Sequence, residues 1–184
     1  MFIHRIDQHL YLKILDISDA NDLFELTSRS RAHLRTWLPW VDETKDVEDS
    51  KIFIQSSLER LPKNNGFTTG IWYKNELAGV ISFHEINWKN HSTSIGYWLG
   101  EGFTGNGIML RSTKALIKYA FNELKLNRIE IRCATDNIKS KAIPEKLGFV
   151  KEGVLRQSEN LPSGFVDHFV YAILKEDWEN RKNP

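Results

Sequence analysis

Four glycines within eight residues make up the segment of this sequence with the clearest chemistry. The segment runs from Gly100 to Gly107 and reads GEGFTGNG, after an apolar stretch that ends at Leu99 and before a segment with helical periodicity. Glycine accepts backbone angles that side chains exclude, so the run permits a tight turn with unobstructed N–H groups. A helix that begins after such a turn adds unpaired N–H groups and the positive end of its dipole. The pattern therefore predicts a phosphate or pyrophosphate site, with a plain structural turn as the alternative.

Two common nucleotide-binding patterns do not fit this glycine run. No Gly-Lys-Ser/Thr follows its last glycine, which excludes the P-loop. Leu110 stands where a dinucleotide fingerprint has its third glycine, and no βαβ unit with an acidic residue at its second strand end follows. The run therefore matches neither fingerprint.

The elements that must position this run alternate between helix and strand. Strands are expected at residues 9–15, 66–73, 77–86, 92–99, 128–135, 149–159 and 165–174. Helices are expected at about 18–26, from 30 to a stop at Pro39, at 47–61 before Pro62, at 108–124, and in a short segment that ends at Leu147 before Gly148. A hairpin turn is expected at 74–76, and a polar turn after the last strand. The mixture predicts one α/β or α+β domain around a mixed sheet, spanning residues 1–184.

The composition is that of one domain with no signature of a nucleic-acid or membrane partner. Among 184 residues, 41% are hydrophobic, and 25 Lys and Arg against 24 Asp and Glu leave a formal charge of +1. The single cysteine, Cys133, allows no internal disulfide and no metal cluster, and is most simply a small buried residue of a strand. No apolar run approaches the roughly 18 residues that span a bilayer. The N-terminus lacks the core of a signal peptide, so we expect a cytoplasmic protein.

A second pattern follows the expected helix 108–124. Residues 137–149 read NIKSKAIPEKLGF, an Asn-x-x-Ser pair followed by Glu-Lys-Leu-Gly-Phe. With the glycine run, with HLRTWLPW at residues 33–40, with EGVLR at 152–156 and with Asp167, the chain resembles the GNAT superfamily of acyl-CoA N-acetyltransferases. It is most similar to the RimJ/RimL branch, the ribosomal-protein N-terminal acetyltransferases and their relatives. The resemblance covers about 9–178, and it is carried by the order and spacing of motifs that are unspecific singly.

The resemblance implies a fold and a cofactor site. The fold would be the GNAT fold, an α+β (α/β) arrangement with a central mixed twisted sheet of about seven strands, flanked by helices. The sheet would be splayed between strands 92–99 and 128–135, where acetyl-CoA lies. Backbone groups of the first strand would pair with the pantetheine arm, and N–H groups of the loop would hold the pyrophosphate. The implied cofactor-binding residues are Tyr97, Trp98, Leu99, Thr104, Gly105, Asn106, Gly107, Ile108, Met109, Asn137 and Ser140.

Two positions depart from the family pattern. Gly102 stands where the family signature usually has Arg or Gln, and a pyrophosphate site built from backbone N–H groups tolerates that change. Pro144 stands where many GNAT enzymes carry the Tyr that protonates the departing thiolate. The RimJ/RimL branch places a serine at Ser140, so the resemblance gives the thiolate-facing role to Ser140. A cap of the following helix is the alternative role of that serine.

Acetyl transfer from a thioester to an amine needs a neutral amine, a stabilised oxyanion and a proton for the thiolate. An α-amino group has a pKa of about 7.7–8.0, so the assistance of a base can be modest and even relayed by water. Glu159 is the candidate base, because the branch carries a glutamate at this spacing after the Glu-Gly-x-x-Arg strand. A solvated carboxylate at a strand end is the other interpretation. No acetyl-cysteine intermediate at Cys133 is expected, since direct attack by the amine is the usual route of the family.

The acceptor side is less defined. His84 and Glu85 lie on the strand before the cofactor strand, where they could bind substrate or supply an alternative base, although a lone histidine on a strand is more often structural. Trp37 and Trp40, and also Trp88, could wall the acceptor pocket, and the first two could equally anchor the core. The acidic run at residues 42–49 could attract a cationic acceptor or be a solvated helix start.

These expectations combine into one function with two alternatives. We expect an acetyl-CoA-dependent N-acetyltransferase that acts on the α-amino group of a protein or peptide, such as a ribosomal protein with an N-terminal Ser or Ala. A small amine (a polyamine, amino sugar or antibiotic) is the alternative acceptor, and a non-catalytic acyl-CoA-binding module is the alternative of another class. No metal, nucleic-acid or membrane partner is expected. The chain is left open between monomer and homodimer.

Overall fold

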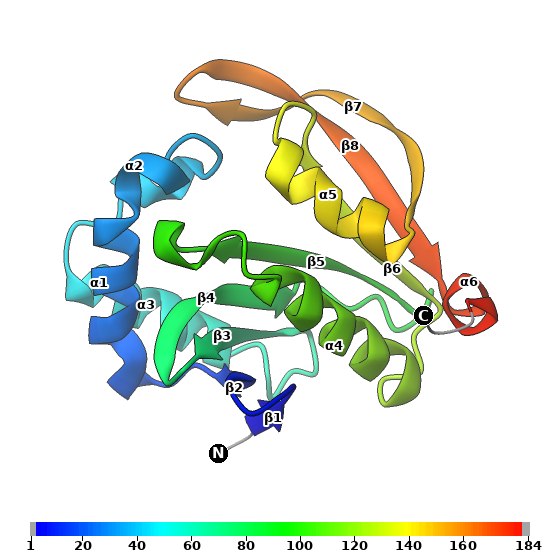
Figure 1. Cartoon of the computed structure of the whole chain (residues 1–184), viewed down its shortest axis with the longest axis horizontal. Helices are drawn as coiled ribbons and strands as arrows, with labels where there is room; N and C mark the ends of the chain where they lie inside the picture. The colour runs from blue at the N-terminus through cyan, green and yellow to red at the C-terminus, as the bar shows by residue number, and fades with distance from the viewer. Residues whose placement is uncertain (1–2, 182–184) are drawn as a thin grey trace.

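Eight strands form one mixed sheet in the computed structural model, which describes residues 3–181 (Figure 1). Their order across the sheet is β1-β2-β3-β4-β5-β6-β8-β7. The strands are β1 (Ile3–Arg5), β2 (Leu10–Ile14), β3 (Phe67–Tyr73), β4 (Glu76–Phe83), β5 (Ser92–Leu99), β6 (Arg128–Ala134), β7 (Val150–Leu161) and β8 (Gly164–Leu174). Neighbours are antiparallel except β5 and β6, which are parallel. The expected mixed sheet is confirmed, with β1 as a further strand at its edge.

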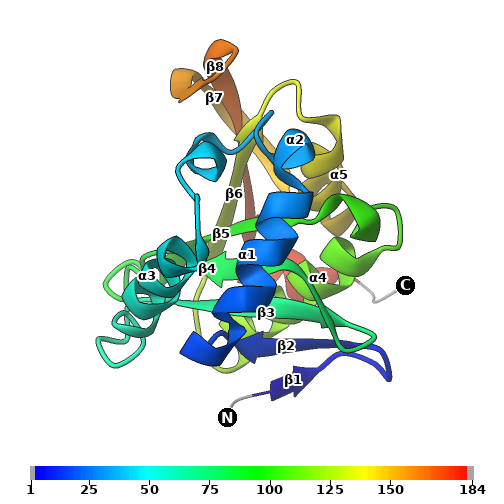
Figure 2. The same ribbon diagram turned by 90° about the vertical axis from the view of Figure 1, so that its left-hand side faces the viewer.

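Helices cover both faces of the sheet. They are α1 (Ala20–Arg29), α2 (Arg31–Leu34), α3 (Val47–Leu58), α4 (Ile108–Asn122), α5 (Ile138–Leu147) and α6 (Lys175–Asn180), with short 3₁₀ turns η1 (Ile17–Asp19), η2 (Pro39–Asp42) and η3 (Glu101–Phe103). On one face α4 buries Ile117 and Phe121 in a core shared with the sheet. On the other, α1 and α3 bury Leu26 and Ile54 against Trp72 (Figure 2).

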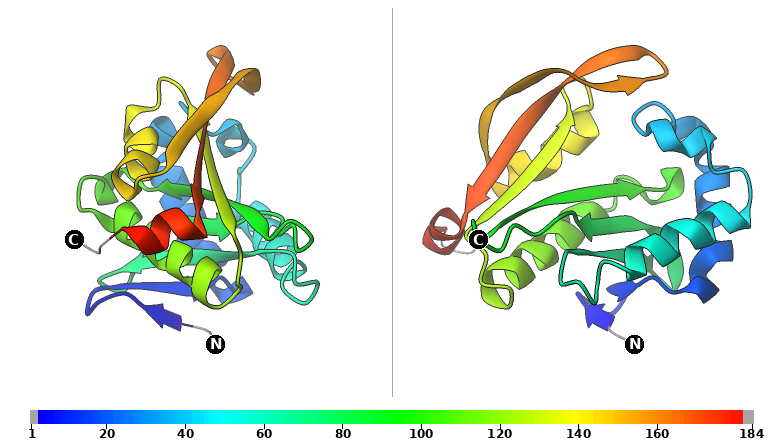
Figure 3. Two further views of the ribbon diagram at one scale, coloured as in Figure 1. Left: turned by 90° about the vertical axis from the view of Figure 1, so that its right-hand side faces the viewer. Right: turned by 180° about the vertical axis from the view of Figure 1, so that it is seen from behind.

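The sheet opens between β5 and β6. Their parallel register covers only Ser92–Ser94 against Arg128–Glu130. Beyond Ser94 the strands diverge, and the hairpin of β7 and β8 extends beyond the rest of the sheet (Figure 3). Backbone N–H and C=O groups on the facing edges beyond this point have no strand partner within the sheet. The splay implied by the resemblance is confirmed.

Local sequence explains most element ends. The β3–β4 hairpin turns through Lys74 and Asn75, both at positive φ (52° and 65°), as two-residue hairpins require. Gly148 follows α5 in the left-handed conformation, at φ 72°, as predicted. Asp46 caps α3 and accepts hydrogen bonds from the first-turn N–H groups.

Three boundaries differ from the expectations. The helix expected to run to Pro39 ends at Leu34, and Pro39 instead starts η2, because proline suits the first position of a helical turn. The helix expected to reach residue 61 ends at Leu58. The polar turn expected near the C-terminus contains α6.

The C-terminal segment anchors α5 and α4. Arg181 donates from Nη1 to the Leu147 carbonyl (2.7 Å) and from Nη2 to the Gly148 carbonyl (2.5 Å). Trp178 of α6 lies against Phe121 of α4, with ring centroids 6.5 Å apart. Within residues 3–181, no helix has the length and apolar character needed to cross a membrane.

Candidate active site

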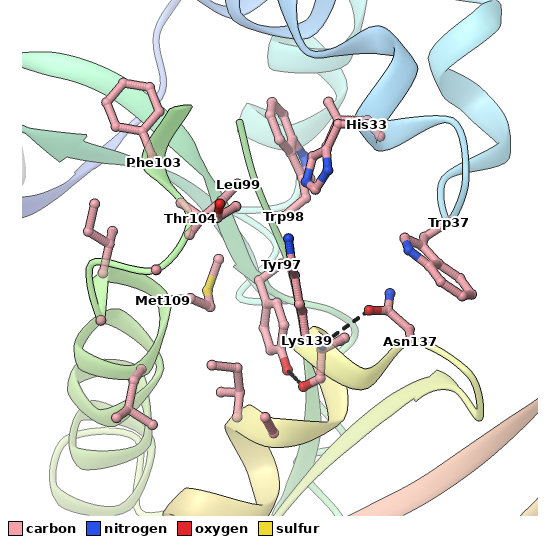
Figure 4. A pocket seen from close by; sticks show the side chains of 18 of the residues that line it. His33, Trp37, Tyr97, Trp98, Leu99, Phe103, Thr104, Met109, Asn137 and Lys139 are labelled. Carbon is pink, nitrogen blue, oxygen red and sulfur yellow. Dashed lines mark hydrogen bonds between the residues drawn. The ribbon is translucent and has the colours of Figure 1, made fainter. Parts of the chain in front are cut away.

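A cavity of about 490 Å³ lies where β5 and β6 diverge (Figure 4). This volume falls within the range of small-molecule sites, roughly 300–1,000 Å³. Its walls come from α2 and the segment after it, from the end of β5, from the loop into α4, and from α5. The lining residues are His33, Leu34, Trp37, Leu38, Tyr97, Trp98, Leu99, Phe103, Thr104, Gly105, Gly107, Ile108, Met109, Leu110, Asn137, Lys139, Ser140, Ala142, Ile143 and Lys146.

The start of α4 forms one end of the cavity and has the properties of an anion site. Gly105 and Gly107 have φ of 82° and 65°, values that side chains rarely adopt. Gly107 caps α4 without a side chain, so no side chain of the cap occupies the first-turn N–H groups. These N–H groups and the helix dipole attract a phosphate group. The prediction made from the glycine run agrees with this geometry, and the lining includes each predicted loop residue except Asn106.

Arg111 holds the loop from outside the cavity. Its Nε and Nη2 donate weakly, at 3.4 Å, to the carbonyls of Gly107 and Asn106. Its Nη1 forms an ion pair with Asp7, in the turn between β1 and β2. The Asp7 carboxylate also accepts hydrogen bonds from the N–H groups of His9 and Leu10. These bonds and Arg111 lower the pKa of Asp7, and they outweigh desolvation, which raises it. The link ties the glycine loop before α4 to the β1–β2 turn.

Gly102 is not required by the backbone of this loop. A Cβ placed there would meet no atom within 4 Å, and its φ is not positive. The position where the resemblance implies Arg or Gln is therefore open here to a longer side chain. The local structure gives no steric reason for glycine.

Asn137 caps α5, and Ser140 does not. The Asn137 Oδ1 accepts the Ser140 N–H at 3.1 Å (Figure 4). This arrangement excludes Ser140 as the helix cap, and its role toward the thiolate stays a prediction. The Asn137 Nδ2 keeps two donors for a ligand, and both side chains line the cavity.

Pro144 explains a hydrogen bond across the cavity floor. Proline has no N–H, so the carbonyl four residues earlier, that of Ser140, receives no helix bond. The Tyr97 hydroxyl of β5 donates to that carbonyl instead, at 3.0 Å. Burial raises the pKa of Tyr97 far above its ordinary value, so the phenol keeps its proton. The bond fixes the first turn of α5 against β5.

Cys133 lies buried on β6 beside Ser140. Burial raises the pKa of its thiol to about 11, and the Ser140 side chain offsets part of that rise. The thiol is therefore protonated at neutral pH and is a poor nucleophile. This agrees with the expected direct attack by an amine.

Aromatic side chains divide between the cavity and the structure around it. Trp37 lines the cavity and faces Asn137 (Figure 4). Trp40 is 36% exposed and packs against Trp98, with ring centroids 5.8 Å apart and planes at 56°. Trp88 lies outside the lining, and its Nε1 donates to the Asn64 carbonyl at 2.7 Å. Trp37 and Trp98 therefore wall the cavity, and Trp88 secures a loop.

Most of the acidic run 42–49 has structural partners. Asp42 forms an ion pair with Arg35 at 2.8 Å. Asp46 and Asp49 form the capping box of α3, and Glu48 pairs with Lys51 at 3.0 Å. These bonds favour the interpretation of the run as a helix start and surface ion pairs.

The candidate acid–base residues of the acceptor side lie outside the cavity lining. Glu159, on the β7–β8 hairpin, bonds to His168 Nε2 at 3.1 Å through its Oε2. His84 and Glu85 follow β4, and His84 Nδ1 lies 2.8 Å from Ser94 Oγ. The hairpin tip and the segment after α2 lie at the same end of the molecule (Figures 1 and 2). An acceptor that enters between them would pass Glu159 on the hairpin, whereas His84 lies beside Ser94, where β5 and β6 are still paired.

Sequence reasoning missed part of the lining. His33 and Leu34 belong to a motif that was noticed but given no site role, and Phe103 lies within the glycine run. Lys139 and Lys146 are seven residues apart, a spacing that places them on one face of α5, which could have marked them as partners of an anionic ligand.

Known proteins resemble this chain over nearly its whole length. The acetyltransferase (GNAT) domain family matches residues 9–150. The putative ribosomal N-acetyltransferase YdaF of Bacillus subtilis (strain 168) is 34% identical over 183 residues, 99% of this chain and 100% of that protein. A ribosomal-protein-serine acetyltransferase of Escherichia coli (strain K12) is 30% identical over 92% of this chain and 95% of its own. The solved structure of RimL, a ribosomal L7/L12 alpha-N-protein acetyltransferase in complex with coenzyme A, matches with a TM-score of 0.91 and 30% identity, over 96% of this chain and 99% of that one.

Proposed function

Because this chain belongs to the acetyltransferase (GNAT) family, we propose that it transfers acetyl from acetyl-CoA to the α-amino group of a protein or peptide, such as a ribosomal protein. One observation carries the proposal. A helix N-terminus capped by glycine opens onto a cavity at the point where two parallel strands separate. This arrangement suits a ligand with a pyrophosphate at one end and an extended arm at the other.

The residues present fit acetyl-CoA as the donor substrate. The α4 N-terminus and Gly105 to Met109 would hold the pyrophosphate. Tyr97 to Leu99 have no strand partner on their β6 side, so their backbone groups can pair with the amides of the pantetheine arm, as in strand addition. Asn137 offers its amide donors, and Lys139 and Lys146 bring positive charge to the α5 wall. The bound thioester supplies the activated acetyl group.

Ser140 and Glu159 are the proposed catalytic residues. The Ser140 hydroxyl, free of a capping role, would face the departing thiolate and supply its proton. Glu159 would take a proton from the ammonium form of the acceptor before attack. The hydrogen bond from His168 holds that carboxylate on the hairpin side of the acceptor entrance.

The names of the relatives support the N-terminus of a protein as the acceptor, and the cavity supports a short peptide end. Trp37 and Trp98 form an aromatic wall, with Trp40 packed behind Trp98, which would admit the first residues of a peptide and exclude water. His84 and Glu85, at the closed end of the gap between β5 and β6, are proposed to contact the acceptor. An N-terminal Ser or Ala is small enough to pass such a wall.

Release of free thiol from acetyl-CoA tests the proposal. We expect turnover with peptides that begin with Ser or Ala, and little with polyamines, amino sugars or aminoglycosides. The reverse preference would assign a small-amine acceptor. Tight binding of acetyl-CoA with no turnover of any amine would contradict the enzyme and leave an acyl-CoA-binding module.

Variants test the two catalytic roles. Ser140→Ala and Glu159→Gln should each lower kcat about 100-fold or more, with little effect on the affinity for acetyl-CoA. Wild-type turnover in either variant would remove that residue from the mechanism. Ser158→Ala, an exposed neighbour of Glu159, is the matched control and should keep wild-type kcat.

A homodimer stays a prediction. The edge strand β7 exposes Val150, Val154 and Leu155, an apolar surface suited to a second copy. Light scattering across a range of protein concentrations decides between monomer and dimer.

A further inference from the structure

We propose that His84 takes the second proton that the acceptor nitrogen loses during acetyl transfer. The proposal rests on the proposed transfer to an amine and adds a proton acceptor to it. An ammonium group carries three protons and the amide product carries one, so two protons must leave the nitrogen. Glu159 is the proposed acceptor of the first proton. The second becomes acidic only after attack, when the new carbon–nitrogen bond leaves a positive charge on nitrogen.

We assign one group to each of these proton transfers. Glu159 takes one proton before attack, and the neutral amine then forms the carbon–nitrogen bond. Nε2 of His84 takes the second proton as the carbon–sulfur bond breaks. The sulfur leaves with the electron pair and takes a proton from the Ser140 hydroxyl, which recovers one from water. Two protons leave nitrogen and one joins sulfur, so each turnover releases one proton to water.

His84 stands at the closed end of the gap between β5 and β6. Its N–H donates to the Ser94 carbonyl at 2.9 Å, and its Nδ1 lies 2.8 Å from Ser94 Oγ. Ser94 is the last residue of β5 that pairs with β6, opposite Glu130. We place the donor on the α4 side of the sheet and the acceptor on the α1 and α3 side, so that the two substrates meet at this gap. His84 therefore borders the place where the two substrates meet.

The imidazole lies on the acceptor side of the sheet. A Cβ placed at Gly96 would come within 2.5 Å of His84 Nε2 and 2.7 Å of its Cε1, so the ring lies over the bare backbone of Gly96. Trp98 is two residues further along β5, on the same face, and belongs to both the aromatic wall and the cavity lining. Donation by Nδ1–H to Ser94 leaves the Nε2 lone pair free on this face.

The charges around the ring keep it ready to accept a proton. Arg60, after α3, and Arg132, on β6, face the imidazole, and burial together with these two cations holds the pKa of His84 below its ordinary 6.5. The Glu130 carboxylate on the same face accepts from Arg132 Nε at 2.5 Å and from Arg128 Nη2 at 3.1 Å. The imidazole therefore stays in its neutral, proton-accepting form at neutral pH.

The pH profile of kcat tests the proposal, with both substrates saturating, between about pH 5 and pH 9. His84→Asn can keep a hydrogen bond to Ser94 and removes the titrating group. We expect a wild-type acid limb with an apparent pKa below that of an ordinary imidazole. His84→Asn should lose about 100-fold in kcat and lose this limb, with unchanged affinity for acetyl-CoA and unchanged Tm. Glu159→Gln should keep the limb.

His91→Asn is the matched control. His91 is exposed, lies in the β4–β5 loop and has φ 49°, a conformation that asparagine tolerates, so wild-type kcat and pH profile are expected. Gly96→Ala is the second variant, because its methyl group would displace the His84 ring and should lower kcat in the wild type but not further in His84→Asn. Free imidazole should restore part of the turnover of His84→Ala.

Two results overturn the proposal. One is His84→Asn with wild-type kcat across the pH range. The other is a lowered kcat with the acid limb unchanged, which would mean that His84 only supports the strand pair. Both presuppose a wild-type protein that acetylates an amine, so they are distinct from failure of the proposed function, in which the wild type turns over no acceptor.

Discussion

Replacing Tyr97 by phenylalanine removes the hydroxyl that donates to the Ser140 carbonyl at 3.0 Å. That carbonyl has no helix donor, because Pro144 occupies the position whose N–H would bond to it. A buried acceptor left without its partner costs about 1–3 kcal/mol. Ser140 borders the cavity, so water can replace part of the bond, and we expect about 1 kcal/mol. For a chain of this length that corresponds to a fall in Tm of about 2–4 °C.

Pro144→Ala provides the complementary perturbation. Alanine restores an N–H at the position that normally bonds to the Ser140 carbonyl, so the Tyr97 hydroxyl loses its unique role. The single variant gains a better helix residue and loses buried packing, and these two effects on stability have opposite signs. The informative quantity is the coupling between the two sites. We expect Tyr97→Phe to cost less than half as much in the Pro144→Ala background as in the wild type.

Urea unfolding followed by circular dichroism measures all four corners of this cycle. Tyr73 lies on β3, far from α5, so Tyr73→Phe is the matched control and should show no coupling to Pro144→Ala. An equal cost of Tyr97→Phe in both backgrounds would refute the reasoning, because the tyrosine would then not compensate for the proline. In the wild-type background we also expect a lower kcat, since the first turn of α5 carries Asn137 and Ser140.

Three further predictions follow from individual side chains. Gly102→Arg should lower the Kd for acetyl-CoA about three- to tenfold by calorimetry, because a Cβ there meets open space and an arginine can reach the phosphates. Gly153→Arg, equally unhindered but on β7, is the charge-matched control, and equal effects of both variants would mean a general charge effect. Because burial raises the pKa of the Cys133 thiol to about 11, the thiol should react with iodoacetamide at pH 8 at least about tenfold more slowly than free cysteine, and faster toward pH 11. A rate like that of free cysteine would contradict its burial. Arg181→Ala should lower the free energy of unfolding by about 1–2 kcal/mol, since the carbonyls of Leu147 and Gly148 lose the two hydrogen bonds from Arg181. Arg181→Lys should recover part of that loss, and unchanged stability in the alanine variant would rule out the anchor.

Features that depend on local sequence could be predicted closely. Strand β5 occupies the expected residues 92–99, and Gly148 ends α5 as expected, because turn and cap chemistry act over a few residues. The tight glycine turn before α4 was predicted for the same reason, since the positive φ of Gly105 and Gly107 depends on residues within the turn, and the phosphate site there stays a prediction. The edge strand β1 was missed, because three exposed residues carry no alternating apolar pattern.

Features that depend on distant contacts could not be predicted from the order of residues. The sequence signals that suggested one longer helix also allow a helix that ends at Leu34, followed by a separate 3₁₀ turn that starts at Pro39. The ion pair of Arg111 with Asp7 joins residues 104 positions apart, and nothing local marks either one. The bond from Tyr97 to Ser140 spans 43 positions and becomes intelligible only once Pro144 is seen inside a helix beside β5.

The same distinction between local and distant contacts separates the two halves of the proposed active site. The donor half is a loop and a helix start, contiguous in sequence from Gly100 to Met109, so local rules describe it and a resemblance transfers well. The proposed acceptor half takes Trp37, His84, Trp98 and Glu159 from four separate segments, and its chemistry would depend on how the sheet opens after Ser94. A change of acceptor can therefore arise from substitutions in α2, in the loop after β4 or in the β7–β8 hairpin without disturbing acetyl-CoA binding. Variants of His84 and Glu159 should accordingly alter kcat and acceptor preference while the Kd for acetyl-CoA stays constant, and a parallel loss of donor affinity in both would show that the two halves are not separable.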